Sequence, residues 1–258
     1  MAAGRRSEWV ELALFVAKLM LAVLVLRSFV AAMFFIPSES MLPRLLIGDY
    51  LLVEKWPYGY SRWSLPGGVP LIPGRLFGGT PARGDVVVFR SPGADSHYVI
   101  KRVIGLPGDT IQVRGGQVIL NGTAVPRERI ADFVLPISPN YTGCPVGHDG
   151  GATCRFARYR ETMPGGRSYD VLDTAPRMEG DDTELFAVPA GSVFLMGDNR
   201  DNSADSRFPA PKGMGYVPMD RLEGRAGVTV FSTDGSASWL RPWTWVSAAR
   251  FGRVGEGF

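Results

Sequence analysis

The chain has 258 residues, 28 Lys and Arg against 25 Asp and Glu, and a formal net charge of +3. That length is enough for one large domain or two small ones with a buried core. The small charge and the lack of basic runs exclude a nucleic-acid-binding surface, while 32 Gly and 20 Pro favour short strands and turns over a helical bundle.

The stretch 10–35 is mostly apolar, and we expect it to be a single transmembrane anchor in contact with lipid. About 20 helical residues span the hydrocarbon core, and 12–30 is long enough. Arg5 and Arg6 precede the stretch, so the positive-inside rule places residues 1–9 in the cytoplasm and the rest of the chain outside. A cleaved signal peptide and a buried core helix are the alternatives. The length of the apolar run and its lack of a polar stripe count against them.

The remainder predicts a mainly β, antiparallel fold, because no long amphipathic helix appears after the anchor. Strands are expected at 50–53, 85–89, 98–104, 111–114, 117–120, 123–125, 192–196 and 226–231. Gly-Gly at 115–116 and Asn-Gly at 121–122 are typical of tight hairpin turns. The predicted division is a β core (36–126 and 190–232), a smaller inserted β subdomain (127–189) and an aromatic, basic tail (233–258).

Two cysteines, Cys144 and Cys154, lie in a Gly-rich loop of the insertion. If this part of the chain is exported, a disulfide between them is expected. Free thiols are one alternative. A metal site with His148 is another, but it lacks C-x-x-C spacing, so we expect no metal and no cofactor.

The tail carries Trp239, Trp243 and Trp245 among arginines. Tryptophan with interleaved arginine suits a membrane interface. A short helix packed on the core explains the pattern equally well, and the sequence does not choose between the two.

Three separated segments carry groups capable of chemistry: I-P-S-E-S-M-L-P at 36–43, K-R-V-I-G-L-P-G-D at 101–109 and G-D-N-R-D-N-S-A-D-S-R at 197–207. The chain has two histidines, His97 and His148, and neither lies near a serine-hydrolase turn. Serine with lysine is therefore the hydrolytic pair that the sequence offers.

Ser40 in the first segment needs a base to become a nucleophile, and Lys101 in the second can act only when neutral. Its pKa must fall from about 10.4, and the apolar residues around it predict the desolvation that lowers it. The alternative is a lysine that extends from a strand edge into solvent. The third segment could be a solvated loop, or a cation site at Asp198, Asp201 and Asp205, but it lacks the EF-hand pattern.

Together with the anchor, these segments resemble the bacterial type I signal peptidase (leader peptidase) family, from residue 5 to about residue 230. The resemblance implies a membrane-bound serine endopeptidase that removes signal peptides from exported preproteins. It implies a single pass through the inner (cytoplasmic) membrane, with the catalytic domain on the outer side. Ser40 would be the nucleophile and Lys101 the general base. The Ser38 hydroxyl and the Ser40 amide would stabilise the oxyanion.

The resemblance also implies residues that support the base: Ser203 by a hydrogen bond to Lys101, Asp198 by pairing with Arg102, and Asp205 and Arg207 by bracing the loop. Gly197 would allow close backbone approach. Glu39 and Arg44 depart from the family's usual residues, and Glu39 is expected to point to solvent.

The substrate, a preprotein with an A-x-A-type cleavage site, would add as an extended strand between the segments that lead to Ser40 and to Lys101. Six residues are expected to line shallow pockets for it: Ile36, Pro37, Met41, Leu45, Val99 and Ile100. We expect a monomer. The rival functions are a Ser/Lys processing peptidase of the same fold with another substrate, and a non-catalytic, membrane-tethered β module that binds partners.

Overall fold

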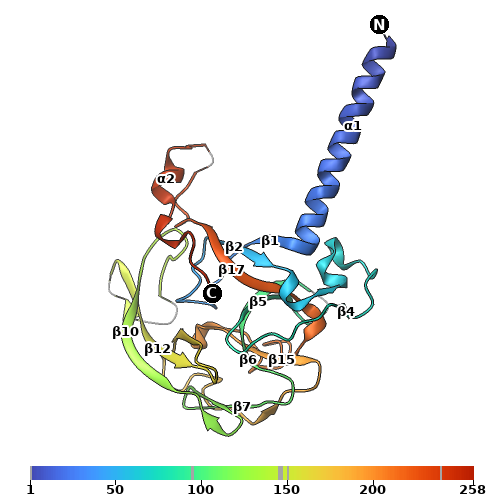
Figure 1. The fold of residues 1–258 in the computed structure, drawn as a ribbon. Helices are drawn as coiled ribbons and strands as arrows, with labels where there is room; N and C mark the ends of the chain where they lie inside the picture. The colour runs from blue at the N-terminus through green and yellow to red at the C-terminus, as the bar shows by residue number, and fades with distance from the viewer. Residues whose placement is uncertain (1, 94–95, 145–147, 150, 239) are drawn as a thin grey trace.

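The computed structural model describes residues 2–93, 96–144, 148–149, 151–238 and 240–258. A long helix, α1 (Ala2–Val25), continues through a π-helical turn, η1 (Leu26–Val30), and projects away from a β domain (Figure 1). Within it Glu8–Val30 is long and apolar enough to cross a membrane, and its apolar 18-residue window is not buried against the rest of the described chain.

The helix ends earlier than the predicted anchor, 10–35. The last five residues of the predicted anchor form strand β1 (Ala31–Phe35), which pairs with β2 (Asp49–Glu54). The residues are apolar enough to prolong the anchor, but sheet pairing satisfies their backbone groups instead. The anchor is therefore joined to the sheet with no intervening linker.

The main sheet has seven antiparallel strands in the order β1-β2-β17-β5-β6-β15-β16 and curls into a half-barrel. Its other strands are β5 (Val86–Arg90), β6 (Tyr98–Gly105), β15 (Ser192–Met196), β16 (Val217–Pro218) and β17 (Leu222–Ser232). β15 pairs with β6 only from Arg102 to Gly105. The preceding half of β6, residues 98–101, thus has a strand on one side only among the described residues.

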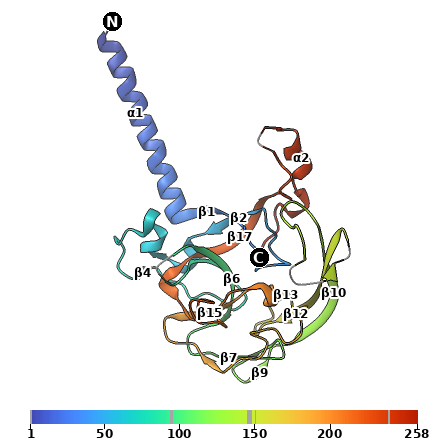
Figure 2. The ribbon, with the colours of Figure 1, turned by 180° about the vertical axis from the view of Figure 1, so that it is seen from behind.

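Two smaller sheets lie below β6 and to its right in Figure 2. One joins β7 (Thr110–Arg114), β8 (Gln117–Leu120), β9 (Thr123–Ala124) and β14 (Phe186–Ala187). The other joins β10 (Arg127–Pro136), β11 (His148–Asp149), β12 (Thr153–Thr162) and β13 (Ser168–Leu172). Both predicted hairpin turns have positive φ at their two central residues, as the Gly-Gly and Asn-Gly pairs indicate.

Short elements complete the fold. They are strands β3 (Tyr60–Ser61) and β4 (Arg75–Leu76), helix α2 (Thr244–Ala248), and the 3₁₀ turns η2 (Trp56–Tyr58), η3 (Arg62–Ser64), η4 (Pro66–Gly68), η5 (Arg200–Asn202), η6 (Met219–Arg221) and η7 (Phe251–Arg253).

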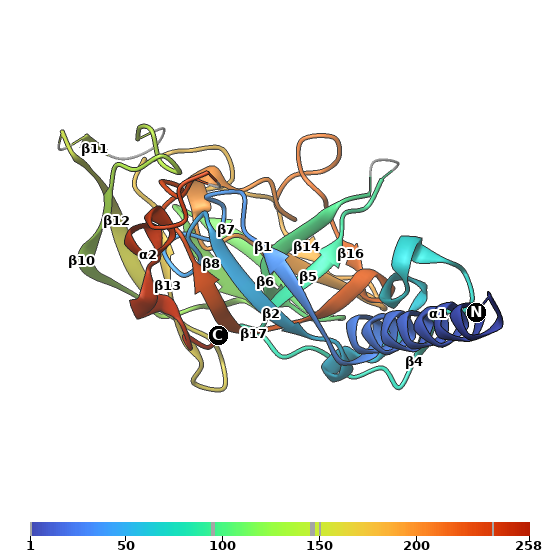
Figure 3. The same ribbon diagram turned by 90° about the horizontal axis from the view of Figure 1, so that it is seen from above.

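The predicted insertion, 127–189, is not separate from the rest of the domain. Its strand β14 pairs with β7, and Val171 and Val188 share an apolar core with Ile104 and Ile111. From above, strands β10 to β13 of this part lie at the end of the domain opposite α1 (Figure 3). Cys144 and Cys154 form the expected disulfide, with Cα atoms 5.5 Å apart.

The tail returns to the main sheet, where Gly257 bridges to Val228 of β17. Trp243 is exposed, whereas Arg253 turns inward and donates to Asp49. Trp239 lies outside the described residues. Both α1 and α2 project from the upper side in Figures 1 and 2. A membrane contact by the tail stays a prediction.

Candidate active site

Ser40 and Lys101, 61 residues apart, meet in the structure. Lys101 lies in β6 at the last position before β15 begins to pair, and Ser40 lies in the loop between β1 and β2. Lys101 Nζ donates a hydrogen bond to Ser40 Oγ over 2.6 Å, and both side chains are buried. Once the amine is neutral, the same contact lets Ser40 Oγ donate its proton to Nζ.

Burial lowers the pKa of Lys101 to about 8. The carboxylates of Asp205 and Asp198 act in the opposite direction because they favour the ammonium form, and Arg207 lowers the pKa further. The sequence predicted this direction from the apolar residues around Lys101. A substantial fraction of the amine is thus neutral near pH 8, which a general base requires.

The third segment packs directly on the Ser40 loop. The Asn199 amide donates to the Ser40 carbonyl over 3.1 Å, and Asn199 Nδ2 donates to the Glu39 carbonyl over 3.2 Å. A Cβ placed on Gly197 would lie 2.5 Å from the Ser40 carbonyl oxygen and 2.3 Å from Ser203 Oγ. Gly197 therefore permits the close backbone approach that the sequence predicted.

Glu39 does not simply point to solvent as predicted. It is half-buried, and Asn202 Nδ2 donates to its Oε2 over 3.0 Å. Burial raises the pKa of Glu39, and the Asn202 bond opposes the rise. The difference arises because the third segment folds over the Ser40 loop, a long-range contact that the sequence does not specify.

Buried ion pairs hold the third segment in place. Arg102 donates to both oxygens of Asp198, over 2.7 and 2.6 Å, as predicted. Arg207 donates to both oxygens of Asp205, whose Oδ2 also accepts the Gly197 amide over 3.0 Å. Burial alone would raise the pKa of Asp205, but its pairing with Arg207 lowers it overall.

The predicted hydrogen bond from Ser203 to Lys101 is absent. Ser203 is buried, yet its hydroxyl has no hydrogen-bond partner of ordinary geometry among the described residues. It lies beside Asp205, and its proximity helps to lower the pKa of that carboxyl. The Ser203 hydroxyl lies close to Gly197 and Asp205. The Lys101 amine donates its hydrogen bond to Ser40 Oγ instead.

Six residues are predicted to line substrate pockets, and the structure places them at different depths. Ile36, Met41 and Leu45 are fully buried in the core of the main sheet, because the loop that carries Ser40 turns its apolar side chains inward. Ile100 belongs to the same core and is 8% exposed. Pro37 is exposed and Val99 is half-buried, so these two are the most accessible of the six. Contact of the six with a substrate stays a prediction.

Sequence reasoning missed a further buried pair. Arg200 donates to both oxygens of Glu161, over 2.9 and 2.5 Å, and Tyr169 donates to the same carboxylate. Arg200 belongs to the third segment, 197–207, which the sequence analysis had singled out. Glu161 belongs to the insertion and is part of no motif. Asn199 could have been singled out from the sequence, because it lies between Asp198 and Ser203 in the third segment.

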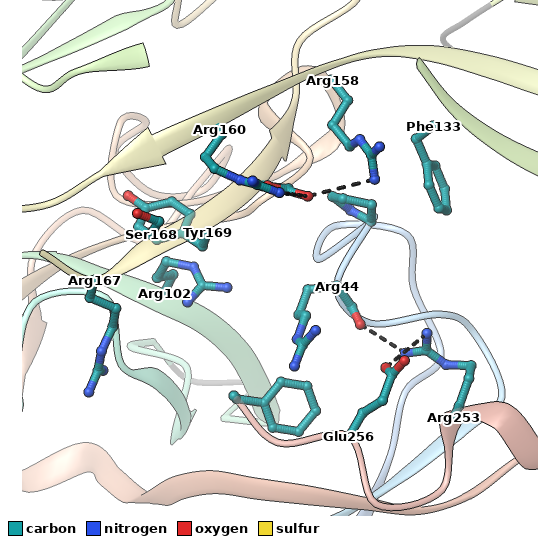
Figure 4. A pocket seen from close by; sticks show the side chains of 13 residues that line it. Arg44, Arg102, Phe133, Arg158, Arg160, Arg167, Ser168, Tyr169, Arg253 and Glu256 are labelled. Carbon is teal, nitrogen blue, oxygen red and sulfur yellow. Dashed lines mark hydrogen bonds and ion pairs between the residues drawn. The ribbon is translucent and has the colours of Figure 1, made fainter. Parts of the chain in front are cut away.

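A basin of about 630 Å³ adjoins the site without including Ser40 or Lys101 (Figure 4). Six arginines line it: Arg44, Arg102, Arg158, Arg160, Arg167 and Arg253. Five of them pair with carboxylates, those of Asp198, Asp170, Asp85, Asp49 and Glu256. Arg44 donates to the Gly257 carbonyl. Most of the positive charge in the basin is thus already compensated.

Comparisons of the sequence and the structure with known proteins point to one family. A family model described as signal peptidase, peptidase S26, matches residues 7–231. Signal peptidase I of Rickettsia typhi is 34% identical over 90% of this chain and 87% of its own, and that of Rickettsia prowazekii is 32% identical over the same shares. A solved signal peptidase I structure from Enterococcus faecalis V583 covers 56% of this chain and 95% of its own at 26% identity. Its TM-score of 0.30 is too low to carry an argument.

Proposed function

The chain belongs to the signal peptidase, peptidase S26, family, and on that premise we propose that it removes signal peptides from exported preproteins with Ser40 as nucleophile and Lys101 as general base. The observation that carries this proposal is the 2.6 Å contact between Lys101 Nζ and Ser40 Oγ in a buried setting. A non-catalytic binding module would not need a desolvated lysine at a serine hydroxyl.

In the acylation step, neutral Lys101 accepts the proton of Ser40 Oγ while the oxygen attacks the scissile carbonyl carbon. The tetrahedral intermediate collapses with cleavage of the C–N bond, and the proton passes from Lys101 to the departing amine. A water molecule then attacks the acyl-enzyme ester with Lys101 as base again. Ser40 is thereby regenerated, and the signal peptide leaves as a carboxylate.

The developing oxyanion needs two donors about 2.7–3.1 Å away. The Ser40 amide and the Ser38 hydroxyl are the proposed donors. Ser38 Oγ lies 3.5 Å from Ser40 Oγ, which supports this assignment because the oxyanion forms beside the attacking oxygen. The Asn199 bond to the Ser40 carbonyl keeps the peptide plane after Ser40 in a fixed orientation.

The substrate is proposed to add as an extended strand along β6. Residues 98–101 of β6 have no strand on the β15 side among the described residues, and that free edge leads directly to Lys101. Phe34 of β1 packs on Tyr98, with ring centroids 4.8 Å apart, so the strand that leads to Ser40 borders the same region. Main-chain hydrogen bonds along this edge would align the scissile bond with Ser40.

The anchor places this chemistry at a membrane surface. η1 runs into β1 without a linker, so the catalytic domain stays close to the bilayer. We propose the orientation with the N-terminus in the cytoplasm and the catalytic domain on the outer side of the inner membrane. Protease added to intact spheroplasts should then digest the domain, and its full protection would contradict the orientation.

The dyad is tested by preprotein cleavage in detergent with Ser40→Ala and Lys101→Ala. Each should lose on the order of 10⁴–10⁶-fold in rate, because nucleophile and base act as a unit. Ser247→Ala and Lys212→Ala are matched controls, since both residues are exposed, and they should cleave like wild type. Cleavage near the wild-type rate by either dyad variant would sink the assignment.

A further inference from the structure

Three aspartates from separate segments meet in the domain. Asp173 follows β13, Asp181 lies in the turn after Met178, and Asp201 lies in η5. Each offers a carboxylate oxygen, and these oxygens all lie within 4.8 Å of one another. The cation set considered from the sequence was different. Its other two members, Asp198 and Asp205, are held by arginines, and only Asp201 belongs to this group.

Two oxygens of this group are buried without a partner. Asp181 is only 4% exposed. Its Oδ2 accepts the Met178 amide over 2.8 Å, but its Oδ1 has no hydrogen-bond partner among the described residues. Asp201 repeats the pattern, since Oδ2 accepts the amides of Thr174 and Ala175 while Oδ1 is buried and unpartnered. Buried polar atoms are nearly always bonded, so two orphaned carboxylate oxygens on aspartates of one cluster indicate a positively charged ligand.

The surrounding protein does not balance the charge. Arg127 pairs with Asp173, while Asp181 and Asp201 have no ion-pair partner in the described part of the chain. Arg207 acts on both from a distance but is bonded to Asp205. Three carboxylates face one another with one guanidinium among them, an arrangement that a divalent cation would relieve.

We propose that Asp173, Asp181 and Asp201 form a site for Ca²⁺. Calcium binds oxygen at 2.3–2.6 Å, so ligand atoms on opposite sides of the ion lie up to about 4.6–5.2 Å apart. Oxygens spread over as much as 4.8 Å fit that range. Magnesium binds at about 2.0–2.1 Å and requires a tighter, octahedral set. Water molecules would complete the 6–8 ligands that calcium takes.

The site would brace the segment behind the nucleophile. Asp201 lies two residues after Asn199, whose amide donates to the Ser40 carbonyl, and four before Asp205, which holds the Gly197 amide. An ion shared by Asp201, Asp173 and Asp181 would tie this segment to the end of β13 and to the turn at 178–181. Calcium should therefore stabilise the folded protein.

The test measures the apparent Tm of the full chain in detergent with CaCl₂, with MgCl₂ and with EDTA. At a calcium concentration about 100 times its Kd, the Tm of the wild type should rise by roughly 5–10 °C over its value in EDTA. Asp181→Asn keeps an oxygen for the Met178 amide and removes the charge, so it should fold and lose most of the rise. Glu184→Gln removes a charge from an exposed side chain three residues away and should keep the full rise.

Two results would overturn the proposal: a wild-type Tm that is the same in CaCl₂ and in EDTA, or a rise in Asp181→Asn as large as in the wild type. A rise with MgCl₂ equal to that with CaCl₂ would overturn the assignment to calcium. None of these readings depends on preprotein cleavage, so this test and that of the Ser40–Lys101 dyad succeed or fail separately.

Discussion

Replacement of Asp198 by Asn should destabilise the protein strongly. The side chains of Arg102 and Asp198 are 4% and 1% exposed, and Arg102 donates to both carboxylate oxygens. Asparagine keeps one acceptor but turns an NH₂ donor toward the guanidinium, which stays buried and charged. Removal of one partner of a buried pair costs about 3–5 kcal/mol. At about 2–4 °C per kcal/mol for chains of this size, the Tm should fall by roughly 6–20 °C.

Thermal unfolding in detergent, followed by tryptophan fluorescence, measures this fall. Asp132→Asn is the matched control, because its pair with Arg129 is exposed and such pairs contribute about 0–1 kcal/mol. A decrease in Tm for Asp198→Asn no larger than that for Asp132→Asn would refute the reasoning. It would mean that the buried pair is not what holds the third segment on β6.

The same substitution should alter the pH dependence of cleavage at temperatures where the variant is folded. The Asp198 carboxylate favours the ammonium form and so raises the pKa of Lys101. Its removal lowers that pKa, and a neutral base then persists to lower pH. The acidic limb of the cleavage profile should therefore move to lower pH. A limb that moves to higher pH would contradict the assigned electrostatics.

Two further substitutions test the geometry around the nucleophile and in the insertion. Gly197→Ala should slow preprotein cleavage sharply, because the new Cβ would collide with Ser203 and with the Ser40 carbonyl oxygen, and a wild-type rate would contradict that contact. Cys144→Ser should remove about 2–4 kcal/mol of stability by opening the disulfide to Cys154, visible as a lower Tm without a change in cleavage rate at 25 °C; an unchanged Tm would show that the loop needs no crosslink.

Local patterns predicted the strands well. Gly-Gly and Asn-Gly flanked by alternating apolar residues specify a hairpin within about ten residues, and β7, β8 and β9 lie where that pattern placed them. The end of the anchor was predicted too late, because Ala31–Phe35 is apolar in either setting and only its pairing with β2 distinguishes a strand from a helix. Such pairing joins residues distant in sequence and leaves little local trace.

The candidate site was predicted unevenly for a related reason. Lys101 followed from the chemistry that a serine nucleophile needs, and the pair of Asp198 with Arg102 followed from the family resemblance. The depth of Met41 and Leu45 in the core was not predicted, because the sequence of a loop does not say which way its side chains turn. Glu161 was missed because a single carboxylate in the insertion carries no signal until its partner, Arg200, is placed beside it.

The dependence of kcat/KM on pH for preprotein cleavage tests the central claim most directly, because it reports the protonation of the free enzyme. With a pKa of about 8 for Lys101, the neutral fraction rises about tenfold between pH 7 and pH 9, and the rate should rise in parallel. Replacement of His97 and His148 together by alanine should leave that profile in place. A profile that is flat between pH 7 and pH 9, or an acidic limb near the ordinary histidine pKa of about 6.5 that vanishes in the histidine variant, would contradict Lys101 as the base.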